Sequence, residues 1–104
     1  MCEDIRAFFT TLSSRADPSI AHGMSNSYVF DVEGVGRWRV EVNLGTVTVT
    51  EGDGDADVVF KSSRDTFSKI IAGKQNPTTA VMTGKLKLKG DVDAAMGAQK
   101  LFKL

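Results

Sequence analysis

The residue types that most often act as nucleophiles or bases are scarce in this chain of 104 residues. Its single histidine, His22, lies in a connection rich in glycine and serine, and its single cysteine is Cys2. Nucleophilic catalysis requires a base beside the nucleophile and a third group that orients the base, and neither neighbourhood suggests an acidic partner for that role. We therefore interpret His22 as a helix-terminal or loop residue, and we expect a protein that is not an enzyme.

A metal site is the next chemistry to consider. Asp53, Asp55 and Asp57 match the first three ligands of an EF-hand calcium loop, but its sixth and twelfth positions, where glycine and glutamate are required, hold Val58 and Arg64. We interpret the triplet as a solvated turn before a strand. A zinc site would need at least three clustered ligands, and the sequence offers no such set. We expect neither a metal nor another cofactor.

Two further patterns suggest ligands. Gly34-Val35-Gly36 lacks the third glycine and the following helix of a dinucleotide-binding motif, so we read it as a hairpin turn. Lys85, Lys87 and Lys89 alternate with apolar residues, which is typical of an edge strand protected from aggregation by its charge. A second interpretation stays open: lysines near a pocket mouth could approach anionic lipid head groups or an anionic membrane surface.

Length and charge narrow the class of protein. The chain of residues 1–104 fits a single domain, and its 13 basic and 13 acidic residues argue against a general nucleic-acid binder. No apolar run approaches the roughly 20 residues that a membrane-spanning helix requires. Glu3 and Asp4 interrupt the basic-then-apolar pattern of a signal peptide. We expect a cytoplasmic protein without stable membrane insertion, although transient contact with a membrane stays open.

The first quarter of the chain is helical in pattern. Ile5, Phe8, Phe9 and Leu12 recur at helical spacing, which predicts an amphipathic helix over residues 3–14 with an aromatic face. Asp17-Pro18 begins a second short helix, for which Gly23 is the expected end.

The period then changes to two. Alternating apolar residues predict three strands, around Tyr28, Phe30 and Val32, then Trp38, Val40, Val42 and Leu44, then Val47 and Val49. Gly34 to Gly36 and Gly45 mark the turns between them, which indicates an antiparallel meander. Asp57 to Lys61 provides a fourth strand.

The last forty residues mix helices with one strand. Ser62 or Ser63 begins a helix that Gly73 ends, and Asn76-Pro77 begins another that Gly84 stops. Lys85 to Lys89 forms the fifth strand, and Asp91 caps a final helix. Because each strand has one charged or threonine-rich face, the helices must cover the other face, giving a two-layer α+β domain.

The apolar residues of this region have two interpretations. Periodicity alone places in the core Phe67, Ile70, Ile71, Val81, Met82, Met96 and Phe102. The two methionines in that set, together with Gly97-Ala98, suit an adaptable cavity better than a tight core. Gln99 adds a polar group that either orients a ligand head group or faces water.

The same region carries a family resemblance. Its motifs are Gly73-Lys74, Asn76-Pro77, Thr83 to Lys87, Gly90-Asp91, Ala95-Met96 and Gln99 to Leu101. In this order they resemble the sterol carrier protein 2 family, most closely over residues 56–102 and more loosely from Ile5 onward. The resemblance implies a five-stranded mixed sheet with about five helices on one face. It also implies non-enzymatic binding, and transfer, of a fatty acid, fatty acyl-CoA or sterol-like lipid in an apolar tunnel.

On this basis we expect the tunnel to have a movable roof. The helix at 64–72, the turn at 77–82 and the C-terminal helix would form it, and lipid would enter where it meets the N-terminal helix. The lipid-binding residues are then predicted to be Phe8, Phe9, Leu12, Trp38, Phe67, Ile70, Ile71, Val81, Met82, Leu86, Met96, Gln99 and Phe102. Peroxisomal members of the family end in a small residue followed by Lys-Leu, whereas this sequence ends Phe102-Lys103-Leu104, which argues against a peroxisomal address and predicts a more open cavity.

Two other functions stay open. The domain could be an accessory module that presents a lipid-like substrate, such as a quinone precursor, to a biosynthetic enzyme. It could also be a structural or dimerisation domain whose cavity is closed. We expect a monomer or a weak homodimer with a small hydrophobic ligand and no nucleic-acid partner.

Overall fold

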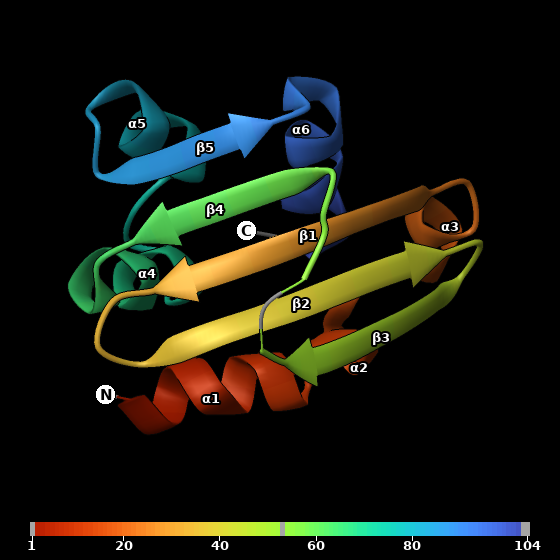
Figure 1. Ribbon diagram of the computed structural model, residues 1–104, viewed down its shortest axis with the longest axis horizontal. Coiled ribbons are helices and arrows are strands. Elements are labelled where there is room, and N and C mark those ends of the chain that lie inside the picture. The colour runs from red at the N-terminus through yellow and green to blue at the C-terminus, as the bar shows by residue number, and fades with distance from the viewer. Residues whose placement is uncertain (1, 53, 103–104) are drawn as a thin grey trace.

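A computed structural model describes residues 2–52 and 54–102, without the side chains of residues 2–4 (Figure 1). The Cys2 side chain, Asp53 and the terminal Lys103-Leu104 therefore lie outside the described part. The elements are α1 (Cys2–Thr10), α2 (Leu12–Arg15), α3 (Pro18–Ala21), β1 (Ser25–Val32), β2 (Gly36–Asn43), β3 (Thr46–Glu51), β4 (Val58–Ser62), α4 (Arg64–Ile71), α5 (Pro77–Met82), β5 (Leu86–Gly90) and α6 (Val92–Leu101). In the described residues, no helix combines the length and apolar character needed to cross a membrane.

The five strands form one mixed sheet in the order β3-β2-β1-β4-β5. The predicted meander is confirmed, because β1, β2 and β3 pair antiparallel. β4 returns beside β1 and pairs with it in parallel, with Phe30 opposite Phe60, and β5 joins β4 antiparallel as an edge strand. The helices lie behind the sheet in Figure 1. The predicted two-layer α+β architecture is therefore confirmed.

The N-terminal helix is shorter than predicted. Instead of one helix over 3–14, α1 ends at Thr10 and α2 begins at Leu12, which brings the helices in the described residues to six. At the break, the Thr11 hydroxyl donates to the Ala7 carbonyl oxygen at 2.8 Å. Threonine side chains that bond to the backbone of the preceding turn bend helices, which accounts for the interruption.

The core lies between α1, α2, α6 and the inner face of the sheet. The Phe9 ring stacks on Trp38 with 4.3 Å between ring centroids and on Phe67 with 5.5 Å. A hydrogen bond joins α2 to the end of α6 there: the Arg15 Nε donates to the Phe102 carbonyl oxygen at 2.8 Å. Aromatic burial of this kind supplies much of the driving force for folding.

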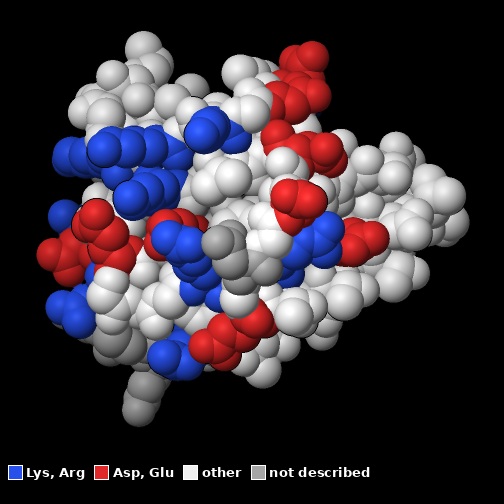
Figure 2. Space-filling view, in the orientation of Figure 1, with Lys and Arg blue, Asp and Glu red and all other residues white. Residues whose placement is uncertain are grey.

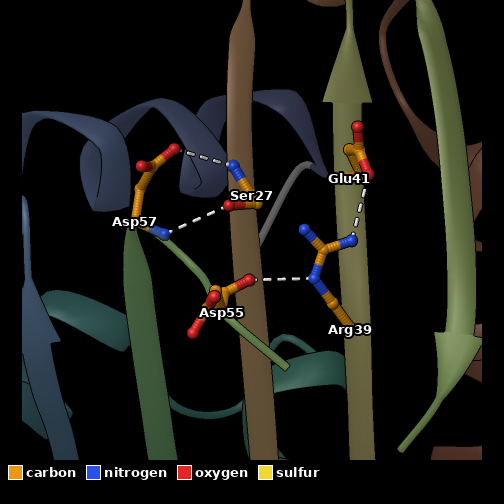
Figure 3. Close-up of polar contacts among 5 residues, drawn as sticks. All are labelled: Ser27, Arg39, Glu41, Asp55 and Asp57. Carbon is orange, nitrogen blue, oxygen red and sulfur yellow. Dashed lines mark hydrogen bonds and ion pairs between the residues drawn. The ribbon is translucent and has the colours of Figure 1, made fainter. Parts of the chain in front are cut away.

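The connection between β3 and β4 crosses the outer face of the sheet (Figures 1 and 3). Asp57 and Ser27 exchange two hydrogen bonds, since the Ser27 amide donates to the Asp57 carboxylate at 3.0 Å and the Asp57 amide donates to the Ser27 hydroxyl at 3.1 Å. The Arg39 Nε donates to the Asp55 carbonyl oxygen at 2.9 Å, and its Nη1 pairs with Glu41 at 3.0 Å. These bonds hold the connection in place, and Asp57 occupies the turn before β4 that its sequence predicts.

Candidate functional site

The hydrophobic interior is divided into two clusters. The larger contains the aromatic core with Phe30 and Phe67, and the smaller contains Ile70, Ala80 and Leu86 beneath α5. Phe60 contacts both clusters. A cavity of about 200 Å³ lies in the gap. Well-packed interiors rarely leave voids larger than a water molecule, so a space of this size is a candidate binding site.

The sheet and three helices line this pocket, mostly with apolar side chains. Their contributions are Phe30, Phe60, Leu86 and Leu88 from the sheet, Phe67 and Ile70 from α4, Pro77, Thr78, Val81 and Met82 from α5, and Val92, Ala95, Met96, Ala98 and Gln99 from α6. The pairing register aligns Phe30, Phe60 and Leu88 in one row across β1, β4 and β5. The row forms the floor, and the small side chains of Ala95 and Ala98 on α6 leave the space above it open.

Capping residues set the positions of α5 and α6. The Asn76 side-chain oxygen accepts from the amides of Thr78 and Thr79 at 2.8 and 3.3 Å. The Asp91 carboxylate accepts from the amides of Asp93 and Ala94 at 2.9 and 3.3 Å. Such caps stabilise a helix start by about 1 kcal/mol each. Both predicted helix starts are confirmed, and they place the two helices on either side of the pocket.

The mouth of the pocket has an apolar rim. Met82 is 81 % exposed, Val92 59 %, Met96 57 % and Val81 37 %. Between α5 and α6, the Thr78 hydroxyl donates to the Gln99 Oε1 at 3.2 Å. Large apolar side chains gathered in water at a pocket mouth are unfavourable for an isolated monomer and are typical of ligand or interaction sites.

Seven of the thirteen predicted lipid-binding residues line this pocket: Phe67, Ile70, Val81, Met82, Leu86, Met96 and Gln99. The other six lie elsewhere. Phe8, Phe9, Leu12, Trp38 and Phe102 are buried in the larger cluster, and Ile71 packs against its edge. The reason is that the aromatic face of α1 packs against Trp38 and Phe67, which leaves it no access to the cavity.

This pocket does not open at the predicted entrance. No described residue of α1 lines it, and the exposed apolar rim belongs to α5 and α6. Gly97 also faces away from the cavity: a Cβ there would lie 3.2 Å from the Met24 methyl group. The small residues that leave room for a ligand are Ala95 and Ala98.

Eight lining residues are not among the thirteen predicted lipid-binding residues: Phe30, Phe60, Pro77, Thr78, Leu88, Val92, Ala95 and Ala98. Alternation marks Phe30 and Leu88 as inward-facing, but only the register of β1, β4 and β5 brings them together with Phe60. Val92 directly follows the Asp91 N-cap, in a helix that buries Ala94, Ala95, Ala98 and Leu101. Its exposure depends on where that helix docks.

The lining of the pocket is suited to enclosing an apolar ligand. Its lining contains no titratable side chain, and Gln99 and Thr78 are its polar members. His22 is exposed at the C-terminal end of α3. Within residues 2–52 and 54–102, no three His, Cys, Asp or Glu side chains are grouped so as to hold a metal ion.

One buried ionisable group lies beside the pocket wall. Burial of Tyr28 raises the pKa of its phenol from 10.0 to about 12, and Asp57 and Asp91 add to this shift while a bond with Asn26 opposes it. The Tyr28 hydroxyl donates to the Ala94 carbonyl oxygen at 2.8 Å. It is therefore a neutral anchor between β1 and α6.

Known proteins share both the sequence pattern and the fold. The SCP-2 sterol transfer family matches residues 6–103. Human hydroxysteroid dehydrogenase-like protein 2 is 38 % identical over 79 residues, which cover 72 % of this chain and 19 % of that protein. This chain thus spans about a fifth of the length of the curated relatives that it matches first.

Solved structures extend the likeness to three dimensions. The sec-alkylsulfatase of a Pseudomonas species matches with a TM-score of 0.76 and 28 % identity over 90 % of this chain and 16 % of the sulfatase. The apo sterol carrier protein 2 of Yarrowia lipolytica matches with a TM-score of 0.70 and 27 % identity over 92 % of this chain and 87 % of its own. With the family match over nearly all of its length and the fold of a solved member, this chain belongs to the SCP-2 sterol transfer family.

Proposed function

We propose that this protein binds the aliphatic chain of a fatty acid or fatty acyl-CoA, without catalysis, in the pocket between the sheet, α4, α5 and α6. Membership of the SCP-2 family implies lipid binding and transfer as the general function. The observation that carries the more specific proposal is a hydrocarbon-lined pocket of about 200 Å³ with an exposed apolar mouth. A flexible chain can place part of its length in such a space, whereas a rigid sterol-like ring system must fit as a unit, so we favour the chain.

The energetics predict that the pocket enlarges when it is filled. Taking about 30 Å³ per water-sized group, the cavity of about 200 Å³ holds roughly seven methylene groups. At about 0.8 kcal/mol each they contribute roughly 5–6 kcal/mol, against an association cost of at least ~4 kcal/mol. Such a balance gives only weak binding. About a dozen enclosed methylenes, worth ~10 kcal/mol before that cost, are needed for useful affinity.

The division of the interior into two hydrophobic clusters would allow the pocket to enlarge. The α5–β5 region rests on the smaller cluster of Ile70, Ala80 and Leu86. A shift of α5 away from α6 would therefore leave the aromatic core intact. The Thr78–Gln99 hydrogen bond would have to open, at a net cost of about 1 kcal/mol.

Titration with a fluorescent fatty acid, followed by displacement with saturated fatty acids of increasing length, tests the proposal. Affinity should rise about fourfold per added methylene until the chain outgrows the enclosure. Absence of saturable binding, or affinity independent of chain length, would refute binding in this pocket.

A second function is favoured by the architecture of the relatives. Hydroxysteroid dehydrogenase-like protein 2 and the sec-alkylsulfatase both contain the matched domain as a small part of a longer chain. In this role the domain would present a lipid-like substrate to an enzyme. Co-purification with a biosynthetic enzyme, together with poor binding of simple fatty acids, would favour presentation over carriage.

A further inference from the structure

Four lysines form an uncompensated basic surface on the outer face of the sheet. They are Lys61 on β4 with Lys85, Lys87 and Lys89 on and beside β5, and Figure 2 shows the basic group over β5. In the β4–β5 register Lys61 lies directly opposite Lys87. Like charges in directly opposed positions destabilise a sheet. The protein therefore retains this arrangement at some cost in stability.

No acidic side chain neutralises the group. In the part of the chain that the structure describes, none of the four ammonium groups takes part in an ion pair. Asp31 neighbours Lys61 in the β1–β4 register, but its carboxylate pairs with the Arg37 Nε at 3.2 Å. In a chain of no net charge, this is a strong local asymmetry.

Protection of the sheet edge explains only part of this pattern. Charged side chains on an edge strand prevent pairing with another chain, and either sign of charge serves that purpose. Lys61, however, lies on β4, which is paired on both sides by β1 and β5. An attraction for an anionic partner accounts for all four lysines.

The basic surface and the apolar mouth share β5 as their common edge. Exposed Met82 ends α5 just before β5, and exposed Val92 begins α6 just after it. In Figure 1, α5 and α6 stand at the two ends of β5. Lysine stems are long enough to lie along apolar surface while their ammonium groups reach a charged layer. Both sets of side chains can thus meet one planar surface.

Two acidic residues bound this edge on the α6 side. Asp91 directs its carboxylate toward the helix start, where it accepts two amide hydrogen bonds. Asp93 is exposed in the first turn of α6. These acids limit the basic surface to the β5 side of the mouth.

We propose that the β5 edge docks on an anionic lipid bilayer. The docking edge consists of Lys61, Lys85, Lys87 and Lys89 together with Val81, Met82, Val92 and Met96. The lysines meet lipid phosphates and carboxylates, and the apolar rim enters the head-group layer, so that a lipid chain passes between bilayer and pocket without crossing water. The inference rests on the proposed function, because it assigns the surface through which the same pocket is loaded.

Vesicle co-sedimentation tests the docking edge. The full chain should bind vesicles of phosphatidylcholine mixed with phosphatidylserine at about 0.15 M salt, and binding should weaken as the salt concentration rises. It should not bind vesicles of phosphatidylcholine alone. Lys85→Gln with Lys87→Gln should weaken binding about 25-fold, at about fivefold for each lysine near the surface. This variant should remain folded, because it relieves the repulsion between Lys61 and Lys87.

Lys69→Gln with Lys74→Gln is the matched control. It removes the same charge from the end of α4 and the turn behind it, and binding should change less than about threefold. Equal losses in the two double variants would overturn the docking edge in favour of general charge attraction. Lack of binding by the unaltered protein would also overturn it. So would a homodimer that the β5 variant abolishes, because a second copy would then cover the edge.

Fatty acid titration without vesicles separates this inference from the proposed function. None of the four lysines lines the pocket, so the β5 variant should bind fatty acid normally. Normal fatty acid binding without any vesicle binding refutes the docking edge alone. Vesicle binding without fatty acid binding refutes the proposed function, and the inference falls with it.

Discussion

Replacing Ala95 with leucine should stabilise the protein and weaken its lipid binding. Ala95 is 8 % exposed and lines the pocket, so the three added carbon atoms would enter existing space rather than displace neighbours. They would occupy roughly 90 Å³ at about 30 Å³ each, which is nearly half of the cavity of about 200 Å³. Their burial contributes ~2.4 kcal/mol, less about 0.5–1 kcal/mol of side-chain entropy, leaving a gain of roughly 1–2 kcal/mol.

The same atoms exclude about three methylene groups of a ligand. The expected loss is ~2.4 kcal/mol of binding free energy, or roughly 50-fold in Kd. Denaturant unfolding measures the stability change, which corresponds to a rise in Tm of about 4–8 °C per kcal/mol for a domain of this size. Displacement of a fluorescent fatty acid measures the affinity.

Ala94→Leu is the matched control, on the neighbouring position of α6. Ala94 is also buried, at 6 % exposure, but it does not line the pocket, and its carbonyl accepts the Tyr28 hydroxyl. Leucine there should overpack the core and destabilise the fold by about 1–3 kcal/mol, while the folded fraction still binds lipid. If Ala95→Leu were destabilising to the same extent, or if it left the affinity unchanged, the pocket would not be the binding site.

Three other predictions concern the frame and the polar lining. Gly90→Ala should destabilise the fold by about 3 kcal/mol in urea unfolding, because the new Cβ would overlap the Asp57 carbonyl oxygen and φ is +118° there. Gly84→Ala, whose Cβ meets open space, should cost only about 1 kcal/mol, and equal costs would contradict the steric argument. Because the pKa of Tyr28 is raised in the folded protein, its contribution to the free energy of unfolding is complete below pH 10 and is lost as the pH rises toward 12. Between about pH 9 and 11, the free energy of unfolding should therefore fall by ~1.3 kcal/mol more in this protein than in the Tyr28→Phe variant. Parallel pH profiles of stability would contradict this. Gln99→Leu should weaken binding of a fatty acid about tenfold, because one hydrogen bond to the head group is lost. Binding of the alkane of the same chain length should be unaffected, and equal effects on both ligands would show that Gln99 does not contact the head group.

Several features of the fold could be read from the sequence because their causes are local. A cap such as Asn76 or Asp91 bonds to amides only two or three residues away, so its role does not depend on the rest of the molecule. The alternation in β2, where Trp38, Val40 and Val42 are buried between more exposed neighbours, indicates one buried face for the same reason. The break at Thr11 is also local, since it coincides with hydrogen bonds from the Thr10 and Thr11 hydroxyls to the preceding turn, but the helical pattern continues on both sides of it.

The pocket itself was only partly predictable. Val81, Met82 and Met96 share helical periodicity with core residues, and they differ from Phe9 or Leu12 only in where their helices dock. The family motifs lie within residues 73–101, which contribute most of the pocket lining. They could not distinguish the aromatic set that packs on Trp38 from the set that faces a cavity, because both sets have the same residue types.

The amino-acid sequence by itself determined the strands, most of the helices and their caps, the two-layer architecture and the family. Only the tertiary structure decided the strand order, which places β4 in parallel beside β1 and leaves β5 at the edge. That order aligns Phe30, Phe60 and Leu88 as a pocket floor and brings Lys61 opposite Lys87 on the outer face. The physical reason is that register and docking depend on contacts between residues far apart in the chain, which a local pattern of hydrophobicity does not encode.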